Sequence, residues 1–215
     1  MIVLKSIEEE RTMRLHSRKA QEHGAITAFE EFVIDTVESA FQEKIFHVLA
    51  YSKTIEYKHV GLSSEAYFAH PLRVTRFVLQ LERQFNLDTV IIALLHNVLE
   101  VSSLTKDVLA QNTNEKVATS ISLLTVNRSK ADDPIYKKEY YEKLSGGFAG
   151  ARIVKIFDKL DNLFLLCLNP DDEAREGYLQ EIEKYIIPEV DMLLPELSSY
   201  YRQLVDNCRD VGFRA

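Results

Sequence analysis

The sequence holds few of the residues that break regular structure, with 7 glycines and 5 prolines among 215 residues. Sandwiches and barrels need a turn about every 8–12 residues, and glycine and proline build most such turns. Their scarcity therefore disfavours an all-β fold. Cysteine is scarce too. Cys167 and Cys208 form neither a CxxC pair nor a zinc-ligand spacing, so we expect free buried thiols in a reducing compartment.

Long apolar runs are also lacking, because none reaches the roughly 18 residues that a membrane span requires. The apolar start Met1–Leu4 is too short for a signal peptide, and three glutamates follow it closely. We therefore expect a cytoplasmic protein without a membrane segment. The net charge of -7 makes binding to a DNA or RNA duplex a poor expectation, although a local basic patch can still bind a nucleotide.

What the sequence does contain is helical periodicity over most of its length, with apolar residues recurring at spacings of three and four. A chain of 215 residues is long enough to fold as one domain without disulfides or a structural metal. We predict an all-α, single-domain, multi-helix bundle. Its parts are a solvated N-terminal helical arm (1–27), a core (28–170) and a C-terminal helical pair packed on the core (171–215). The expected helices cover residues 28–58, 65–83, 87–99, 105–110, 115–125, 134–144, 150–167, 173–187 and 191–211.

Two of these helices carry polar residues inside apolar stretches, where an imidazole or a charge must be paired or bound to a metal. His70 lies directly before a proline in the segment Tyr67–Pro71. Taken alone, it fits a core histidine that bonds a carbonyl group. His96 and Asn97 interrupt the most apolar run of the chain, and Glu100 lies four residues after His96, on the same helix face. An apolar helix gains nothing from these residues unless they meet partners inside the protein.

The helix expected at 150–167 repeats this pattern. Asp158 and Asn162 are four residues apart and share a face, and Asp161 neighbours both. The three segments together resemble the HD-domain phosphohydrolases. They are closest to the small, hydrolase-only branch of the RelA/SpoT-type guanosine-3′,5′-bis(diphosphate) 3′-pyrophosphohydrolases. The matching residues are Tyr67, His70, Pro71, Ala93, Leu94, Leu95, His96, Glu100, Val154, Lys155, Asp158, Leu160 and Asn162.

The resemblance covers roughly residues 40–170 and implies a role for each matching position. In the family, two histidines and two aspartates hold one divalent metal ion, usually manganese, which polarises a phosphate and activates a water molecule. Here the implied metal ligands are His70, His96, Asn97 and Asp158, and the implied acid/base is Glu100. The implied substrate-binding residues are Lys155, Lys159, Asn162 and Tyr67.

The chain also departs from the family pattern. Asn97 replaces the aspartate of the His-Asp pair, Val101 replaces an aspartate after the glutamate, and Lys159 replaces an arginine. The basic segment expected before the first histidine has no clear match in Tyr57–Leu62. Asparagine can ligate a hard cation through its oxygen, but it brings no negative charge and accepts no proton from water. We therefore expect weaker metal affinity than in the family.

Three functions remain open from the sequence. The first is a metal-dependent phosphohydrolase that acts on a nucleotide, with a (p)ppGpp-type 3′-pyrophosphate or a related nucleotide as the expected substrate. The second is a weakened or inactive HD pseudo-enzyme that serves as a nucleotide sensor or an interaction module. The third is a purely structural helical module, which leaves the buried polar residues without an explanation. We expect no synthetase domain in this chain, and a homodimer is possible through its last helices.

Overall fold

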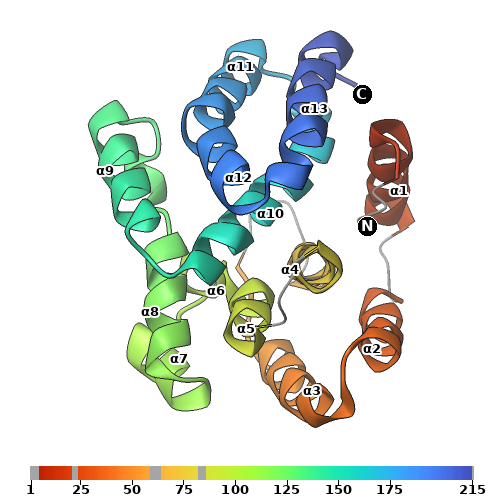
Figure 1. Ribbon diagram of the computed structural model, residues 1–215, viewed down its shortest axis with the longest axis vertical. Coiled ribbons are helices and arrows are strands. Elements are labelled where there is room, and N and C mark those ends of the chain that lie inside the picture. The colour runs from red at the N-terminus through yellow and green to blue at the C-terminus, as the bar shows by residue number, and fades with distance from the viewer. Residues whose placement is uncertain (1–4, 21–23, 59–63, 82–85, 215) are drawn as a thin grey trace. The chain divides into compact units, whose positions relative to one another are not determined.

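The computed structural model describes residues 5–20, 24–58, 64–81 and 86–214, and these residues form helices joined by turns, without a strand (Figure 1). Side chains are not described for 17–20, 64–67 and 81. The all-α prediction is confirmed. Among the described helices, none has both the length and the apolar character needed to cross a membrane.

The helices group into two compact units. One comprises residues 21–155, and the other combines residues 1–20 with 156–215. Helix α10 (Ala149–Leu165) contains residues of both, so no linker separates them along the chain. This agrees with a single all-α domain. The predicted boundaries at residues 27 and 170 stay a prediction.

The unit of residues 21–155 is built around α5 (Leu87–Leu95), whose residues 89–95 are all buried. Figure 1 shows α5 between α8 on one side and α3 and α4 on the other, and α5 packs against all three. An apolar helix without a polar face needs such a central position. The other helices are α2 (Ala25–Thr36), α3 (Ser39–Lys53), α4 (Ser64–Leu81), α6 (Val98–Val101), α7 (Lys106–Asn112), α8 (Glu115–Leu124) and α9 (Pro134–Ser145).

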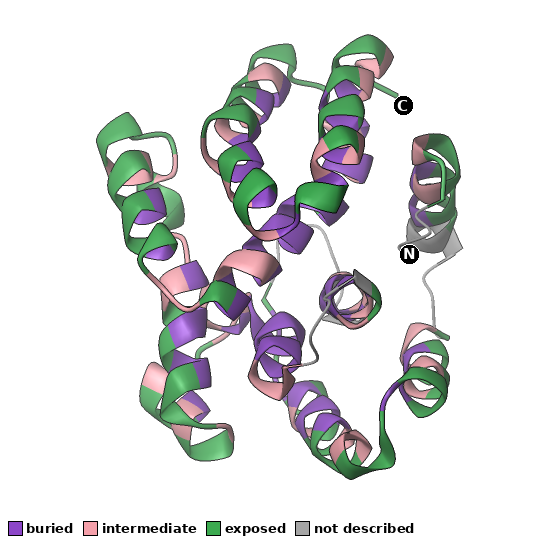
Figure 2. Cartoon of the chain, viewed as in Figure 1, coloured by how far each residue is buried: buried purple, intermediate pink, exposed green. Residues whose placement is uncertain are grey.

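The second unit pairs the N-terminal helix α1 (Ile7–Ala20) with the C-terminal part of the chain. Figure 2 shows that α13 turns a buried face inward and an exposed face outward. On the buried face, the Tyr201 hydroxyl donates to the Ile156 carbonyl of α10 at 3.1 Å. The remaining elements are the 3-10 turn Leu166–Leu168, α11 (Asp172–Glu181), the π-helical turn Ile182–Ile186, α12 (Ile187–Leu193), the 3-10 turn Pro195–Leu197 and α13 (Ser198–Val211).

The prediction of one long helix over residues 28–58 was wrong, because the chain breaks between α2 and α3. Val37 and Glu38 adopt extended ψ angles of 138° and 136°. The break leaves backbone carbonyls of α2 without helical partners. The Gln42 side chain replaces those partners by donating to the Val37 carbonyl at 2.7 Å and to the Ile34 carbonyl at 3.2 Å. Apolar periodicity continues across the break and therefore conceals it.

Three further helix ends differ from the prediction. The helix expected at 87–99 ends at Leu95, and a turn at His96–Asn97 separates it from α6. Pro188 does not end a helix, because the π-helical turn Ile182–Ile186 leads directly into α12, and Pro188 lies in the first turn of α12. The last helix begins at Ser198 rather than at residue 191.

Candidate functional site

His96 stands at the end of the most buried helix of the chain. The side chain of Asn86 caps the N-terminus of α5 by accepting a hydrogen bond from the Thr89 N–H at 3.1 Å. His96 directly follows the last residue of α5, and 2% of the surface of His96 is exposed. The Nδ1 atom of His96 lies 2.7 Å from the Ala93 carbonyl oxygen. Since a carbonyl only accepts, Nδ1–H is the donor, and in the neutral ring the lone pair is then on Nε2.

His70 brings a second imidazole to this atom. It lies on α4 and is half-buried, and its Nε2 is 3.2 Å from the Nε2 of His96. The ring centroids are 5.1 Å apart and the planes are inclined by 69°. Two nitrogens that bind one tetrahedral ion at about 2.0–2.1 Å lie about 3.3–3.4 Å apart. The observed pair therefore fits two imidazole ligands of a single metal ion.

Asn97 occupies the turn between α5 and α6 and is half-buried. Its carbonyl accepts the Glu100 N–H at 2.9 Å, while its side chain does not cap α6. Val101, at the second altered position, is buried with 3% exposure, and its carbonyl accepts the Lys58 N–H at 2.6 Å. The valine thus belongs to the apolar core of this unit. The role of Asn97 as a ligand stays a prediction.

Glu100 has a defined environment within the same unit. Its side chain is 9% exposed, and Oε1 accepts the backbone N–H of Val126 at 2.8 Å. Oε2 lies 3.5 Å from the guanidinium of Arg128, which is 64% exposed. Sequence reasoning missed Arg128, because no spacing rule connects a loop residue to a carboxylate 28 positions earlier. The two contacts hold the carboxylate in one orientation, three residues after Asn97 in sequence.

Asp158 is 5% exposed and lies near the middle of α10. Its Oδ1 accepts a hydrogen bond from the Asn162 Nδ2 at 2.9 Å, and Asn162 itself is exposed. The two residues therefore share a helix face, as their spacing predicts. A hydrogen bond of this kind orients a carboxylate and limits its rotation.

Asp161 is completely buried and is paired with an arginine of the N-terminal helix. The Arg14 Nε donates to Asp161 Oδ1 at 2.7 Å, and Arg14 is 4% exposed. Burial alone would lower the pKa of Arg14, but the charges and hydrogen bonds of Asp161 and Glu10 raise it overall. The prediction of a solvated N-terminal arm was wrong, because this helix buries Arg14 and also Arg11, which is 0% exposed. Sequence reasoning gave Asp161 no partner.

Two lysines implied as substrate ligands have partners of their own. Lys159 is 9% exposed, donates to Glu181 Oε1 at 2.7 Å and lies 4.3 Å from the centroid of the Tyr178 ring. Lys155, in the other unit, is 7% exposed and lies 5.7 Å from the centroid of the Tyr140 ring. The side chain of Tyr67 lies outside the described part of the chain. The substrate-binding roles of these residues stay predictions.

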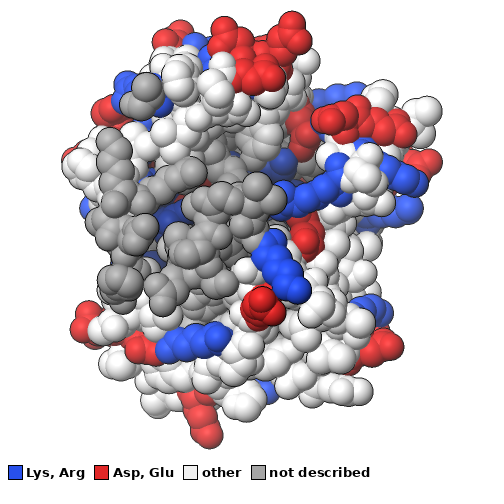
Figure 3. All heavy atoms as spheres, turned by 180° about the vertical axis from the view of Figure 1, so that it is seen from behind, with Lys and Arg blue, Asp and Glu red and all other residues white. Residues whose placement is uncertain are grey.

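On the face drawn in Figure 3, Lys and Arg side chains are interspersed with Asp and Glu side chains. This mixture is typical of a solvated surface and matches the moderate net charge of -7. The prediction that the chain does not bind a nucleic-acid duplex is not tested by this surface.

Comparison with known proteins finds a likeness to solved structures. No protein-family model and no curated protein sequence matches the chain. A solved structure described as "A metazoan ortholog of SpoT hydrolyzes ppGpp and plays a role in starvation responses" matches with a TM-score of 0.61 and 18% sequence identity. The match covers 79% of this chain and 96% of that one. At this identity the likeness shows the fold, and the chain therefore has the all-α fold of this SpoT-type hydrolase, as its three polar segments predicted.

Proposed function

We propose that the chain is a metal-dependent phosphohydrolase of the HD type that acts on a nucleotide. The substrate we propose is a (p)ppGpp-type 3′-pyrophosphate or a related nucleotide. The observation that carries the proposal is the 3.2 Å distance between the Nε2 atoms of His70 and His96. The Ala93 carbonyl fixes the tautomer of His96 by accepting its Nδ1–H. The likeness in fold to a ppGpp hydrolase supports the same proposal.

The proposed metal ligands are two imidazole nitrogens and a carboxylate oxygen, from His70, His96 and Asp158. Asn97 is the proposed fourth ligand, through its amide oxygen. Such a set suits a divalent cation, and Mn²⁺ is the ion we propose. When bound, the ion would polarise a phosphate and lower the pKa of a water molecule. With Asn97 in place of an aspartate, the site contributes one negative charge instead of two, so we expect weaker binding than in a complete HD site.

The other site residues would act on the substrate and on its protons. Glu100 is the proposed acid/base, and its contacts with Val126 and Arg128 orient its carboxylate. Asn162 and Lys155 are proposed to bind the substrate, together with Tyr67. Lys159 would contribute only by exchanging Glu181 for a phosphate oxygen.

Calorimetric titration with Mn²⁺ tests the proposed site before any substrate is known. We expect the wild type to bind Mn²⁺ and His96→Ala to lose measurable binding. His47→Ala is the matched control, since His47 is an exposed histidine of the same unit, on α3. Phosphate and pyrophosphate release from a panel of nucleotides in the presence of Mn²⁺ then tests turnover. A wild-type protein that binds no divalent ion would refute the proposal.

The alternative is a pseudo-enzyme that binds a nucleotide without hydrolysing it. It is favoured by Asn97 in the histidine turn and by the burial of Val101, which leaves Glu100 without the acidic neighbour of the family. The two functions separate in one experiment. Saturable nucleotide binding without product release over many hours, with Mn²⁺ present, would establish the alternative and reject the hydrolase.

A further inference from the structure

The contact between α1 and α10 is built around one buried guanidinium. Arg14 Nε donates to Asp161 Oδ1 at 2.7 Å, while its Nη1 lies 2.5 Å from Glu10 Oε2 and donates to the Glu10 carbonyl at 2.9 Å. The Arg14 Cζ is also 4.2 Å from the centroid of the Phe164 ring, three positions further along α10. Arg14 therefore contacts two residues of α10, Asp161 and Phe164, and is itself bonded to the backbone of α1.

The α10 residues that Arg14 contacts alternate with the site residues. Asp161 follows Asp158 by three positions, which is less than one helical turn, and it precedes Asn162 directly. Asn162 in turn donates to Asp158 Oδ1. A shift of this turn would move the Asp158 carboxylate and its hydrogen-bond partner together.

We propose that Arg14 is a positioning residue, which holds the turn of α10 that presents Asp158 and Asn162. This inference rests on the proposed function, because it requires Asp158 to bind a metal ion. Arginine suits the role because its planar fork contacts Asp161 and Glu10 at once, whereas the ammonium of lysine is a point charge. Residues that hold a metal ligand in place typically change metal affinity about 10–100-fold when they are altered.

Arg11 is a matched control on the same helix. It is also completely buried, but it donates to Glu8 Oε2 at 3.0 Å and to Asn207 Oδ1 at 2.6 Å, in α1 and α13. Replacing Arg11 therefore weakens the attachment of α1 while the Arg14–Asp161 contact is kept. A general loosening of α1 would affect both variants, whereas positioning of Asp158 depends on Arg14.

Mn²⁺ affinity measured by calorimetry tests the inference on the full chain, with circular dichroism to verify helicity. We expect Arg14→Lys to weaken Mn²⁺ binding about tenfold, toward the lower end of the range for such residues. Arg11→Lys should stay within about twofold of the wild type. Asp161→Asn should also stay close to the wild type, because its amide oxygen still accepts the hydrogen bond from Arg14 Nε.

The outcomes separate this inference from the function on which it rests. Absence of Mn²⁺ binding to the wild type would overturn the proposed function and this inference with it. Wild-type binding together with unchanged affinity of Arg14→Lys would overturn the positioning role alone. Equal losses in the Arg14 and Arg11 variants would also overturn it, since they would show a general effect of α1. A large loss in Asp161→Asn would show that charge at position 161, and not its geometry, controls the ion.

Discussion

Two regions of the molecule bury polar side chains in apolar helices, and they do so in opposite ways. In the unit of residues 21–155, the Nε2 atoms of His70 and His96 face each other at 3.2 Å, so the contact joins two groups of the same kind. In the other unit, Arg14 and Asp161 form a pair of opposite charges at 2.7 Å. The first arrangement joins two nitrogen atoms that suit a shared cation, whereas the second pairs opposite charges within the protein itself. A buried polar residue therefore indicates a site only when its partner is known.

The largest effect that we expect comes from breaking the charged pair. Asp161→Leu would leave the Arg14 guanidinium buried without its aspartate, which typically costs about 3–5 kcal/mol of unfolding free energy. Denaturant unfolding followed by circular dichroism measures this loss. Asp206→Leu is the control, because Asp206 is exposed on the neighbouring helix α13 and its replacement should change stability by less than about 0.5 kcal/mol. Equal stability of the two variants would show that the pair contributes nothing.

Alanine substitutions at Gly150 and Gly177 compare how tightly the two units are packed around these positions. A Cβ at Gly150 would lie 2.3 Å from Thr89 Oγ1 and 2.4 Å from the Phe148 ring, so Gly150→Ala should destabilise by about 1–3 kcal/mol through overpacking. Nothing lies within 4 Å of a Cβ at Gly177, on α11, and Gly177→Ala should stabilise by about 0.5–1 kcal/mol. Thermal midpoints of both variants test the opposite signs, and a shared sign would contradict this packing.

A substitution at Asn97 tests whether the histidine pair belongs to a metal site. Asn97→Asp restores a negative charge, so it should raise Mn²⁺ affinity, and calorimetry with both forms measures the change. Asn112→Asp is a suitable control, since it adds the same charge at the end of α7. Weaker or unchanged binding by Asn97→Asp would contradict the placement of Asn97 at the ion.

A smaller effect is expected from removing the ion. Stabilisation by a ligand follows RT ln(1 + [L]/Kd), so a weakly bound ion at modest excess adds about 1–3 kcal/mol. A chelator should therefore lower the thermal midpoint by a few degrees and leave the helical circular dichroism intact. Loss of helicity at room temperature on chelation would show instead that the ion is needed for folding.

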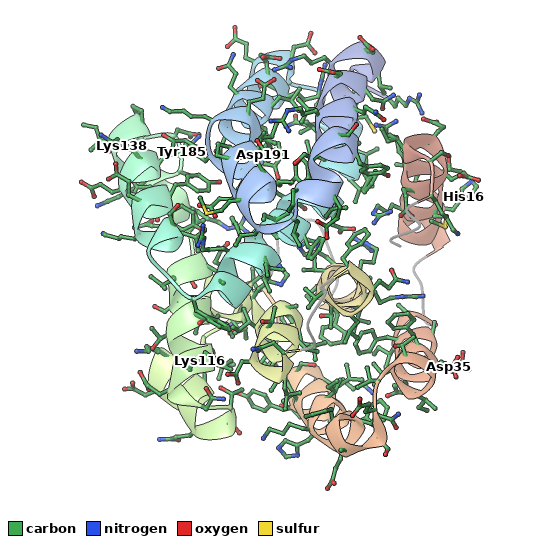
Figure 4. The ribbon with its side chains drawn as sticks, viewed as in Figure 1. His16, Asp35, Lys116, Lys138, Tyr185 and Asp191 are labelled. Atoms are coloured by element: carbon green, nitrogen blue, oxygen red, sulfur yellow. The ribbon has the colours of Figure 1, made fainter. Side chains whose placement is uncertain are left out.

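The smallest effect concerns an exposed ion pair between Asp191 of α12 and Arg202 of α13 (Figure 4 labels Asp191). Hydrogen bonds from Arg202 and Ser198 lower the pKa of Asp191 to about 2, below its ordinary 3.8. A lowered folded-state pKa stabilises the protein above pH 3.8, and this contribution is lost as the pH falls through about 2. Arg202→Gln should therefore shift the Asp191 titration, followed by NMR, toward its ordinary value, with little change in the thermal midpoint. An unshifted titration would contradict the pair.

Much of the fold follows from apolar spacing, since α5 is buried on every side as its sequence predicts. Periodicity does not reveal the break at Val37–Glu38, because the apolar positions remain in phase and a single glutamine side chain completes the broken backbone bonds. It also fails for α1, where the buried residues are arginines. Their charge indicates solvent exposure until their partners are known, and the partners on other helices, Asp161 and Asn207, lie far away in sequence.

Part of the candidate site could be predicted in the same way. His70 and His96 were identified because they lie in apolar helices, and the structure brings their Nε2 atoms together. The partners of Glu100 could not be predicted, since one is a backbone N–H and the other an exposed loop arginine. Asp158 and Asn162 share a face because helical spacing alone places them there.

The division of the chain into units also has a consequence for its synthesis. Residues 1–20 leave the ribosome before the segment 21–155, but Arg14 meets Asp161 only 147 positions later, and Arg11 meets Asn207 only 196 positions later. At about 5–20 residues per second, the first helix waits roughly 10–40 seconds for its last partner. The segment 21–155 can become compact during that delay. The N-terminal helix is therefore made before the segment 21–155 but completes its contacts only after that segment has been synthesised.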